Sequence, residues 1–176
     1  MFFGYIRDYK GLDLLIEAWA MLHKRGLTQG RKLLVVGEVY GADTKYTEQI
    51  ARLGLEDEVV MHTRFVPDGE VADYFSVAQM VALPYKSATQ SGVTQVAYAF
   101  GVPMIVTRVG GLAEIVPDGV VGLLADVSAE SVAEAIEKAW QEGNLDRFRE
   151  GIEREKHRFS WDATADVIEQ LYGQIK

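Results

Sequence analysis

GVPMIVTRVGGLAEIVPDGVVGLL, residues 101–124, is the most informative stretch of this chain. It contains an almost continuous apolar run at 102–107, which predicts a strand buried on both faces. Two glycines then begin a short helix at 110–116, and a turn with another short strand follows within 117–125. Apolar strands that alternate with helices in this way indicate a parallel sheet.

The same alternation extends outward in both directions from this stretch. Strands are predicted at 2–6, 32–38, 58–63 and 80–85. Helices are predicted at 11–25, at 43–54 with Asp43 or Thr44 as the cap, at 65–75 after Pro67-Asp68-Gly69, at 93–100, at 128–140 with Ser128 as the cap, and once or twice within 144–174. The predicted fold class is therefore α/β, a doubly wound, Rossmann-like parallel sheet of about six strands with helices on both faces.

Composition and charge limit the possible functions. The chain has 176 residues, which suits a single domain, and its 48% hydrophobic content is that of an ordinary globular protein. Its net charge is −8, from 18 basic and 26 acidic residues, so nucleic acid is not expected as the main partner. Without cysteines it has neither disulfides nor thiolate chemistry. No signal peptide or membrane-spanning run is recognisable, and a cytoplasmic location is expected.

In a doubly wound sheet, ligands bind beyond the carboxyl ends of the strands, where the strand order reverses. The loops to search are 7–11, 37–43, 64–68, 84–92 and 107–113. They contain neither the G-x-x-x-x-G-K-[ST] phosphate loop nor a G-x-G-x-x-G after the first strand. The three histidines lack metal-ligand spacing, and these loops hold no D-x-D-like acidic pair, so no metal site is expected.

Three glycine-containing loops remain as candidates. The first, Gly4 to Gly11, presents Arg7 and Lys10 where a helix begins, and a phosphate there would gain both cations and helix amides. The alternative is that both cations are simply solvated in a turn.

The second loop, Ala88 to Thr94, places Ser91, Gly92 and Val93 at a helix start, where backbone N–H groups suit a diphosphate. The alternative is that Ser91 only caps its own helix.

In the third loop, Gly110 and Gly111 allow a close approach of the backbone to a ligand, and Glu114 follows on the first helical turn. The alternative for this loop is a flexible connector whose glutamate complements the helix dipole.

An ordered set of short motifs supports a family resemblance. The motifs are K-G at 10–11, V-V-G-E at 35–38, F-V-P at 65–67, L-P-Y at 83–85, G-V-P-M-I-V-T at 101–107, G-G-L-A-E-I-V at 110–116 and D-G-V-V-G-L-L at 118–124. In this order they resemble the C-terminal, nucleotide-sugar-binding domain of a GT-B glycosyltransferase of group 1, or family 4. The resemblance covers about residues 2 to 172, and the segment 101–124 is its most specific part.

The resemblance implies a retaining glycosyltransferase, and the absence of a D-x-D-like pair from the loops makes a metal-independent transfer the expectation. Residues 1–176 would be the single donor-binding half, and the acceptor would be held by an N-terminal domain that this chain lacks. The donor would be a UDP- or GDP-linked sugar, used as substrate with no further cofactor. This half alone is expected to be inactive, and membrane contact is expected only through the missing half. Bacterial polysaccharide biosynthesis is the pathway that the family suggests.

The family's functional positions can be transferred residue by residue. Lys10 matches the lysine of the K-G motif, which contacts the diphosphate, and Arg7 is its expected catalytic companion. The other positions are expected to bind the donor: Gly4, Gly37, Glu38, Arg64, Phe65, Val66, Tyr85, Gln90, Ser91, Gly92, Val93, Gln95, Gly110, Gly111 and Glu114.

The sequence departs from the family pattern at three positions. Tyr5 stands where many relatives have an arginine after the first glycine, so Arg7 is expected to replace it. Ala88 and Val96 occupy the positions of two glutamates that contact the donor sugar and the ribose, and neither side chain accepts a hydrogen bond. Gln90 and Gln95 are expected to take over some of these contacts. The loss of the acidic pair also supports an alternative, a non-catalytic nucleotide- or protein-binding module with the same sheet.

The C-terminal region has two interpretations. The last predicted helix spans about 160–174 and contains Trp161 and Tyr172. Three apolar side chains in and just before it matter here, those of Phe159, Trp161 and Leu171. They either pack on the sheet or form an exposed apolar patch that another domain would cover.

Overall fold

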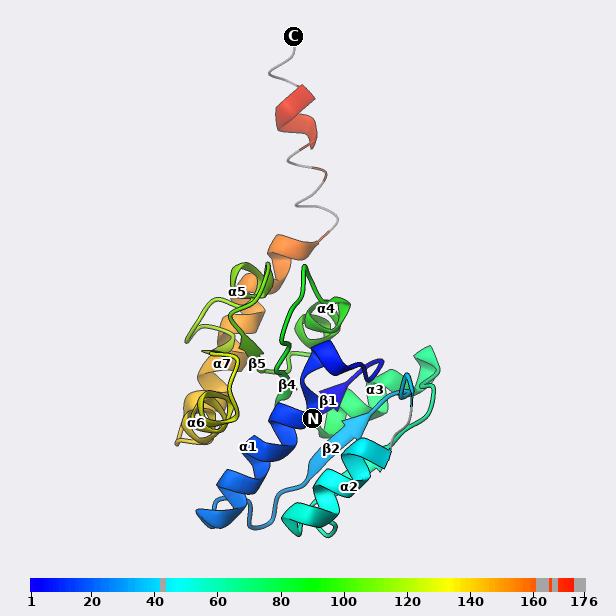
Figure 1. The fold of residues 1–176 in the computed structure, drawn as a ribbon. Helices are drawn as coiled ribbons and strands as arrows, with labels where there is room; N and C mark the ends of the chain where they lie inside the picture. The colour runs from blue at the N-terminus through cyan, green and yellow to red at the C-terminus, as the bar shows by residue number, and fades with distance from the viewer. Residues whose placement is uncertain (42–43, 161–164, 166–167, 173–176) are drawn as a thin grey trace.

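The fold was analysed in a computed structural model, which describes residues 1–41, 44–160, 165 and 168–172 (Figure 1). The expected cap Asp43 and the aromatic residue Trp161 lie outside these residues. Six strands alternate with helices along the chain, as predicted. The strands are β1 (Phe2–Phe3), β2 (Leu33–Val36), β3 (Val59–His62), β4 (Val81–Leu83), β5 (Met104–Thr107) and β6 (Gly122–Ala125).

The strands form two parallel three-stranded sheets that meet at β1 and β4. Within the sheets the strand orders are β1-β2-β3 and β4-β5-β6. The N–H of Ala82 donates to the carbonyl oxygen of Met1 at 2.8 Å, which places β4 beside β1. The combined order is therefore β3-β2-β1-β4-β5-β6, which reverses between β1 and β4. The prediction of a doubly wound parallel fold is confirmed, and the reversal marks where a ligand is expected.

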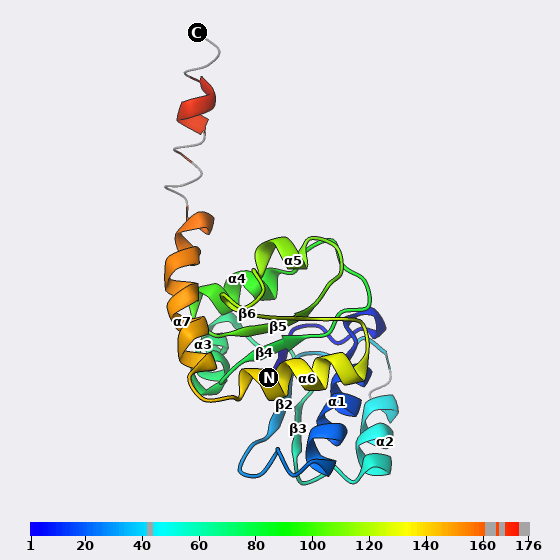
Figure 2. The ribbon, with the colours of Figure 1, turned by 90° about the vertical axis from the view of Figure 1, so that its left-hand side faces the viewer.

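Helices cover both faces of these sheets (Figure 2). They are α1 (Leu12–Lys24), α2 (Thr44–Leu53), α3 (Asp68–Val77), α4 (Gly92–Ala99), α5 (Leu112–Ile115), α6 (Ala129–Ala139) and α7 (Asn144–Glu155), with short 3₁₀ helices η1 (Asp8–Lys10) and η2 (Lys156–Phe159). Helices α1, α2 and α6 contribute to one hydrophobic core, and α3, α4 and α5 contribute to the other; α7 contributes Phe148 to the first and Ile152 to the second.

Alternation along the strands explains the two cores. In β5, Ile105 packs into the core beneath α1 and α6, whereas its neighbours Met104 and Val106 pack into the opposite core. Ala82 and its neighbour Leu83 in β4 divide in the same way. Successive side chains of a strand point to opposite faces, so a strand covered on both faces must be apolar throughout.

The strands are shorter than predicted, and two of the boundary differences have a local cause. Strand β1 ends at Phe3 instead of residue 6, because Gly4 takes a φ of +101° that breaks the strand; Ile6 then pairs with Val39 in an isolated bridge. Asp68 and Gly69 lie inside α3, whereas the sequence suggested a turn before the helix. Pro67 precedes α3 with an extended backbone and lets the helix begin directly after it.

The ends of the later helices agree with the sequence signals. Ser128 caps α6, and its Oγ accepts a hydrogen bond from the N–H of Ser131 at 3.1 Å. The Phe159 ring packs against Tyr98 with a centroid distance of 4.8 Å, whereas Leu171, in the helical segment 168–172, is 54% exposed. Phe159 therefore packs on the domain, and Leu171 forms part of an exposed apolar surface.

One carboxylate joins three segments at the end of the domain opposite the strands' carboxyl ends. The indole N–H of Trp19 donates to Glu58 Oε2 at 2.8 Å, and the hydroxyl of Thr28 donates to Oε1 at 3.1 Å. His23 Nδ1 lies 2.6 Å from the same Oε1. Burial alone would raise the pKa of Glu58, but the hydrogen bonds from Thr28, Trp19 and His23 outweigh it and hold that pKa below its usual value.

Glu58→Ala is expected to destabilise the domain by about 2 kcal/mol, because it leaves the partly buried Trp19 and Thr28 donors without their acceptor. Urea unfolding at pH 7 measures the loss. The matched control is Glu56→Ala, which removes an exposed carboxylate two residues away and should change stability by less than about 0.5 kcal/mol. Equal effects of the two substitutions would contradict the role assigned to Glu58.

The contribution of Glu58 is also expected to depend on pH. The pKa of Glu58 is lower in the folded protein than in the unfolded chain, so the folded state is stabilised when the carboxylate is charged. This contribution is complete above the ordinary glutamate pKa of about 4.3 and is lost as the pH falls through the folded value. The stability difference between the wild type and Glu58→Gln should therefore shrink on acidification from pH 6 to pH 3.

Candidate functional site

The loops after β1 and β4 are fixed to one another where the strand order reverses. Gly11, which precedes α1, has a φ of +69°, and a Cβ atom there would overlap the carbonyl oxygen of Pro84. The N–H of Lys86 donates to the carbonyl oxygen of Tyr9 at 2.7 Å. The glycine of the K-G motif is therefore required by the close approach of two backbones. This contact fixes Lys10 beside the loop that leads to α4.

Lys10 places a half-buried ammonium group between these loops. Its Nζ lies 5.5 Å from the ring centroid of Tyr85 and 3.4 Å from the position that a Cβ on Gly4 would occupy. Within the described part of the chain, the ammonium forms no hydrogen bond or ion pair with another side chain. Burial, followed by repulsion from Arg7, lowers the pKa of Lys10. The charge of a bound anion would offset both effects, because it favours the charged form of the ammonium.

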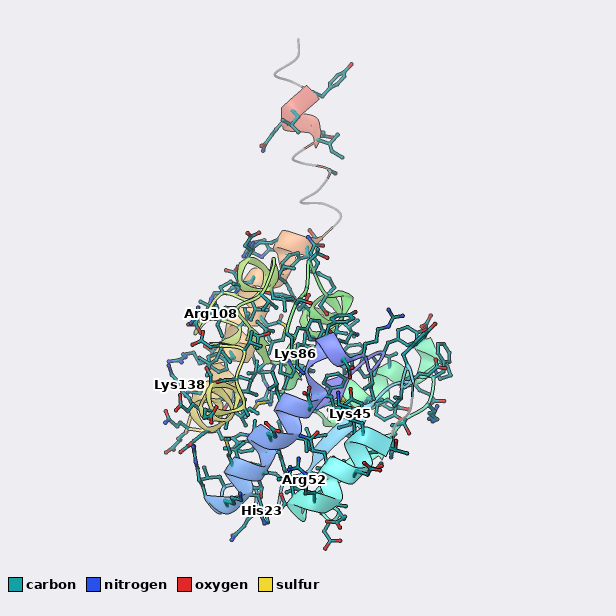
Figure 3. All side chains as sticks on the ribbon, viewed as in Figure 1. His23, Lys45, Arg52, Lys86, Arg108 and Lys138 are labelled. Carbon is teal, nitrogen blue, oxygen red and sulfur yellow. The ribbon has the colours of Figure 1, made fainter. Side chains whose placement is uncertain are left out.

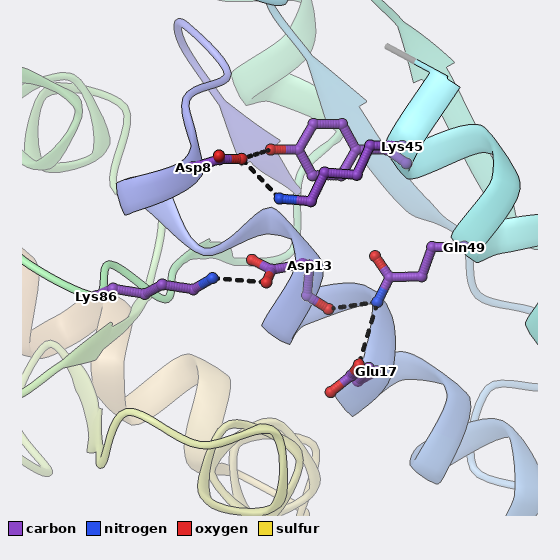
Figure 4. Close-up of polar contacts among 7 residues, drawn as sticks. Asp8, Asp13, Glu17, Lys45, Gln49 and Lys86 are labelled. Atoms are coloured by element: carbon purple, nitrogen blue, oxygen red, sulfur yellow. Dashed lines mark hydrogen bonds and ion pairs between the residues drawn. The ribbon is translucent and has the colours of Figure 1, made fainter. Parts of the chain in front are cut away.

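The neighbouring lysines are already neutralised. Lys45 lies 2.7 Å from Asp8, and Lys86 lies 2.6 Å from Asp13 (Figure 4). Both lysines are seen in the wider view of the side chains around the start of α1 (Figure 3). Lys10 thus differs from these two cations, because it is more buried than a surface lysine and lacks a carboxylate partner in the described residues.

The start of α4 is open. Ser91 occupies the N-cap position, but its side chain makes no capping hydrogen bond; its Oγ lies 3.1 Å from the hydroxyl of Tyr85. The alternative that Ser91 caps its own helix is therefore wrong. Gly92 is exposed at the first helical position. The first N–H groups of a helix have no partner within it, so this end can receive an anionic ligand.

Tyr85 connects the two halves of this candidate anion site. Its side chain is 2% exposed, with the Lys10 ammonium near its ring and Ser91 at its hydroxyl. Burial raises the pKa of Tyr85, which keeps the phenol neutral. Tyr85 therefore contacts both Lys10 and Ser91 at the helix start, and it adds no charge to the site.

The glycine pair after β5 approaches another loop of the protein. A Cβ at Gly110, which has a φ of +49°, would overlap the carbonyl oxygen of Ala88. The N–H of Gly111 donates to the carbonyl oxygen of Thr89 at 2.9 Å. This pair therefore packs the β5 loop against the loop that leads to α4. Whether Gly110, Gly111 and the exposed Glu114 also contact a donor stays a prediction.

A cavity of about 250 Å³ lies beside Lys10 and gathers several predicted positions. Its lining contains five of the expected donor-binding residues and both Tyr5 and Val96, where the sequence departs from the family pattern. The lining residues are Phe3, Gly4, Tyr5, Gly37, Glu38, Phe65, Val66, Asp68, Val71 and Val96. The sequence analysis missed Phe3, Asp68 and Val71, which lie within predicted secondary-structure elements and carry no glycine or cation signal.

Other predicted residues lie outside this cavity lining. Arg64 is exposed and forms an ion pair with Glu70. Gln90 and Gln95 are exposed near the start of α4. Arg7 lies over the ring of Tyr40, 4.4 Å from its centroid, and lines a separate cavity of about 400 Å³. The structure thus groups Lys10 with Gly4 and the start of α4, whereas Arg7 contacts Tyr40 and is close enough to Lys10 only to repel it.

A further cavity of about 390 Å³ contains none of the predicted residues. It is lined by Trp19, Met80 and Trp140, among others, near the amino ends of β2 and β4. Parallel sheets bind ligands at the opposite ends of their strands, so this cavity is not assigned to the candidate site. In the described residues, no three acidic or histidine side chains form a metal-ligand cluster, and no helix has the length and apolar character to cross a membrane.

The sequence of this chain is similar to the sequences of known glycosyltransferases. Residues 1–142 match the family described as Glycosyl transferases group 1. The chain is 31% identical over 182 residues to a D-inositol 3-phosphate glycosyltransferase of Actinosynnema mirum, an alignment that covers 99% of this chain and 44% of that protein. The chain therefore spans less than half the length of this relative.

Two solved structures have the same fold. Sucrose-phosphate synthase from Thermosynechococcus elongatus superposes with a TM-score of 0.79 and 26% identity, covering 99% of this chain and 45% of the other. Anabaena HepE, in complex with UDP-glucose, superposes with a TM-score of 0.78 and 21% identity, covering 98% and 48%. The second similarity concerns the fold alone.

Proposed function

The chain belongs to the group 1 glycosyl transferases and has the fold of GT-B enzymes, and from this premise we propose that it holds the nucleoside diphosphate part of an activated sugar. The observation that carries the proposal is the Lys10 ammonium, which is half-buried and has no carboxylate partner in the described part of the chain. It lies where the strand order reverses, next to the open start of α4. A diphosphate supplies the negative charge that this location lacks.

The proposed site would act by stabilising the leaving group. As the bond between sugar and diphosphate breaks, negative charge grows on the diphosphate oxygens. Lys10 and the N–H groups at Gly92 and Val93 would stabilise that charge, and groups fixed before the reaction need no reorganisation. The adjacent cavity, with the exposed Phe65 on its wall, would take the nucleoside. UDP is the first candidate, since HepE was solved with UDP-glucose.

The finer features of the reaction are also proposals. Transfer with retention of configuration is what the family resemblance implies, and transfer without a metal ion is expected because the loops lack a D-x-D-like acidic pair. The acceptor and its binding site would belong to a second domain, in keeping with the 44% of its relative that this chain spans. On this view the 176-residue chain binds nucleotide but does not turn over a donor by itself.

A non-catalytic nucleotide-binding module is the second candidate. This alternative is favoured by Ala88 and Val96, which stand where many relatives have glutamates. Ala88 offers a ligand no carboxylate, and its carbonyl packs against Gly110. Val96 lines the cavity with an apolar side chain. Sugar transfer by a two-domain protein that contains this chain would exclude it.

Nucleoside diphosphates are expected to stabilise the chain against heat. At 100 times its dissociation constant a ligand adds about 2.7 kcal/mol, which corresponds to a rise in Tm of roughly 5–10 °C for a chain of this size. A thermal-shift panel of UDP, GDP and ADP, each compared with its nucleoside, measures this effect. The nucleosides lack the diphosphate and should shift Tm much less. If no diphosphate raises Tm at millimolar concentration, the proposed function is wrong.

A further inference from the structure

The cavity beside Lys10 has few groups that can accept a hydrogen bond from a ligand hydroxyl. The side chains of Phe3, Phe65, Val66, Val71 and Val96 form its apolar walls. Its carboxylates belong to two residues only, Glu38 and Asp68. A sugar diol that enters this cavity therefore has one of these two carboxylates as its strongest acceptor.

A series of close contacts leads from Lys10 to Glu38. The Lys10 ammonium lies beside Gly4, and Gly4 is packed so tightly against Gly37 that a Cβ on Gly37 would overlap the Gly4 carbonyl. Glu38 is the next residue. Phe65 and Val66 line the cavity from a different segment, the connection between β3 and α3. In a nucleoside diphosphate the ribose lies between the diphosphate and the base, and Glu38 directly follows the glycine that packs against Gly4 beside Lys10.

The backbone of Glu38 is fixed while its carboxylate is available. The N–H of Ile6 donates to the carbonyl oxygen of Glu38 at 2.8 Å, and the N–H of Gly37 donates to the carbonyl oxygen of His62 at 3.1 Å. The Glu38 side chain is exposed and forms no hydrogen bond or ion pair with the other described residues. Asp68, in contrast, lies in the first turn of α3, where its charge favours its own helix.

We propose that the carboxylate of Glu38 binds the ribose hydroxyls of the nucleotide and makes this chain selective for ribonucleotides. The inference rests on the proposed function and specifies it further, because it names the residue that recognises the sugar of the nucleotide. Two neighbouring hydroxyls can donate to the two oxygens of one carboxylate. Val96 cannot form such bonds from α4, so the loop after β2 provides them instead.

Calorimetric titration of the 176-residue chain tests this assignment with two ligand pairs, UDP with 2′-deoxy-UDP and GDP with 2′-deoxy-GDP. The wild type is expected to bind the ribonucleotide of the preferred pair at least about 10-fold more tightly, as loss of one hydrogen bond to a charged group implies. Glu38→Ala should weaken the ribonucleotide, which loses both hydroxyl contacts, by about that factor more than the deoxy analogue, which loses only the 3′-hydroxyl contact. The ratio of the two dissociation constants should therefore fall close to 1. Glu38→Gln, which retains one acceptor oxygen, should give an intermediate ratio.

Two control variants separate this role from others. Asp68→Asn removes the second carboxylate of the cavity and should retain the wild-type ratio. Lys10→Ala should weaken both ligands of a pair equally, because both carry the same diphosphate.

The outcomes distinguish the two proposals. A wild-type chain that binds a ribonucleotide, with a ratio that Glu38→Ala leaves unchanged, overturns the role of Glu38 and leaves the proposed function standing. If the ratio of the deoxynucleotide to the ribonucleotide dissociation constant instead falls to about 1 in Asp68→Asn, Asp68 binds the ribose hydroxyls, and the inference is likewise overturned. If none of the four nucleotides binds the wild type, the proposed function and the inference resting on it both fail.

Discussion

Gly110→Ala is expected to destabilise the domain by roughly 2–5 kcal/mol. A residue with a side chain at a φ of +49° costs about 1–2 kcal/mol, and the added methyl group would overlap the Ala88 carbonyl, a type of overpacking that costs a further 1–3 kcal/mol. Both partners of this clash are backbone or rigid atoms, so the loops must separate to relieve it. Urea unfolding followed by circular dichroism measures the loss.

Gly101→Ala is the matched control for this substitution. Gly101 has a φ of +66°, but no atom lies within 4 Å of the position of an added Cβ. Its replacement should therefore cost only the backbone strain of about 1–2 kcal/mol. The difference between the two variants isolates the close approach of the loops after β4 and β5. If the free energy of unfolding falls by the same amount in both variants, the close packing of these two loops does not add to the stability of the domain.

Lys10→Ala is expected to weaken the binding of a nucleoside diphosphate by about 10- to 100-fold. The substitution removes a half-buried cation that has no carboxylate partner in the described residues. Hydrogen bonds from a charged donor contribute about 1.5–3 kcal/mol, which corresponds to such a change in affinity. Calorimetric titration at low salt, with the nucleotide that binds most tightly to the wild type, measures the effect.

Two further variants control for charge and packing in this experiment. Lys24→Ala makes the same change in net charge at the exposed end of α1 and should leave the affinity within about twofold of the wild type. Lys10→Met keeps an unbranched side chain near Tyr85 while it removes the charge, so it should bind as weakly as Lys10→Ala. Wild-type affinity in both Lys10 variants would remove this lysine from the site.

The sequence predicted the elements of this fold more accurately than their ends. The apolar runs around Leu33 and Ile105 identified strands because residues buried on both faces leave no polar positions. Ser128 identified the start of α6 because its side chain forms a local hydrogen bond. The end of β1 could not be predicted. The strand stops where Gly4 takes a positive φ and packs against Gly37, and these two residues are far apart in the chain.

The candidate site was predictable where the chemistry is local. Lys10 and Gly92 could be selected as candidates because a cation and a helix start at strand ends can bind a phosphate, and the structure brings Lys10 close to the start of α4. Asp68 was missed as a cavity residue, because only the three-dimensional arrangement brings α3 beside the loop after β2. The location of Arg7 over Tyr40 likewise depends on a side-chain contact that spacing alone does not reveal.

The junction between β1 and β4 has a mechanical consequence. Each half of the fold has a three-stranded sheet of its own, and the Ala82–Met1 and Lys86–Tyr9 hydrogen bonds are among the links that join the halves. A ligand held by Lys10 on one side and by the start of α4 on the other would act as a cross-link between them. The binding free energy of the ligand would then also oppose a sliding of one half past the other. A chain with bound ligand would therefore be more rigid than the free chain.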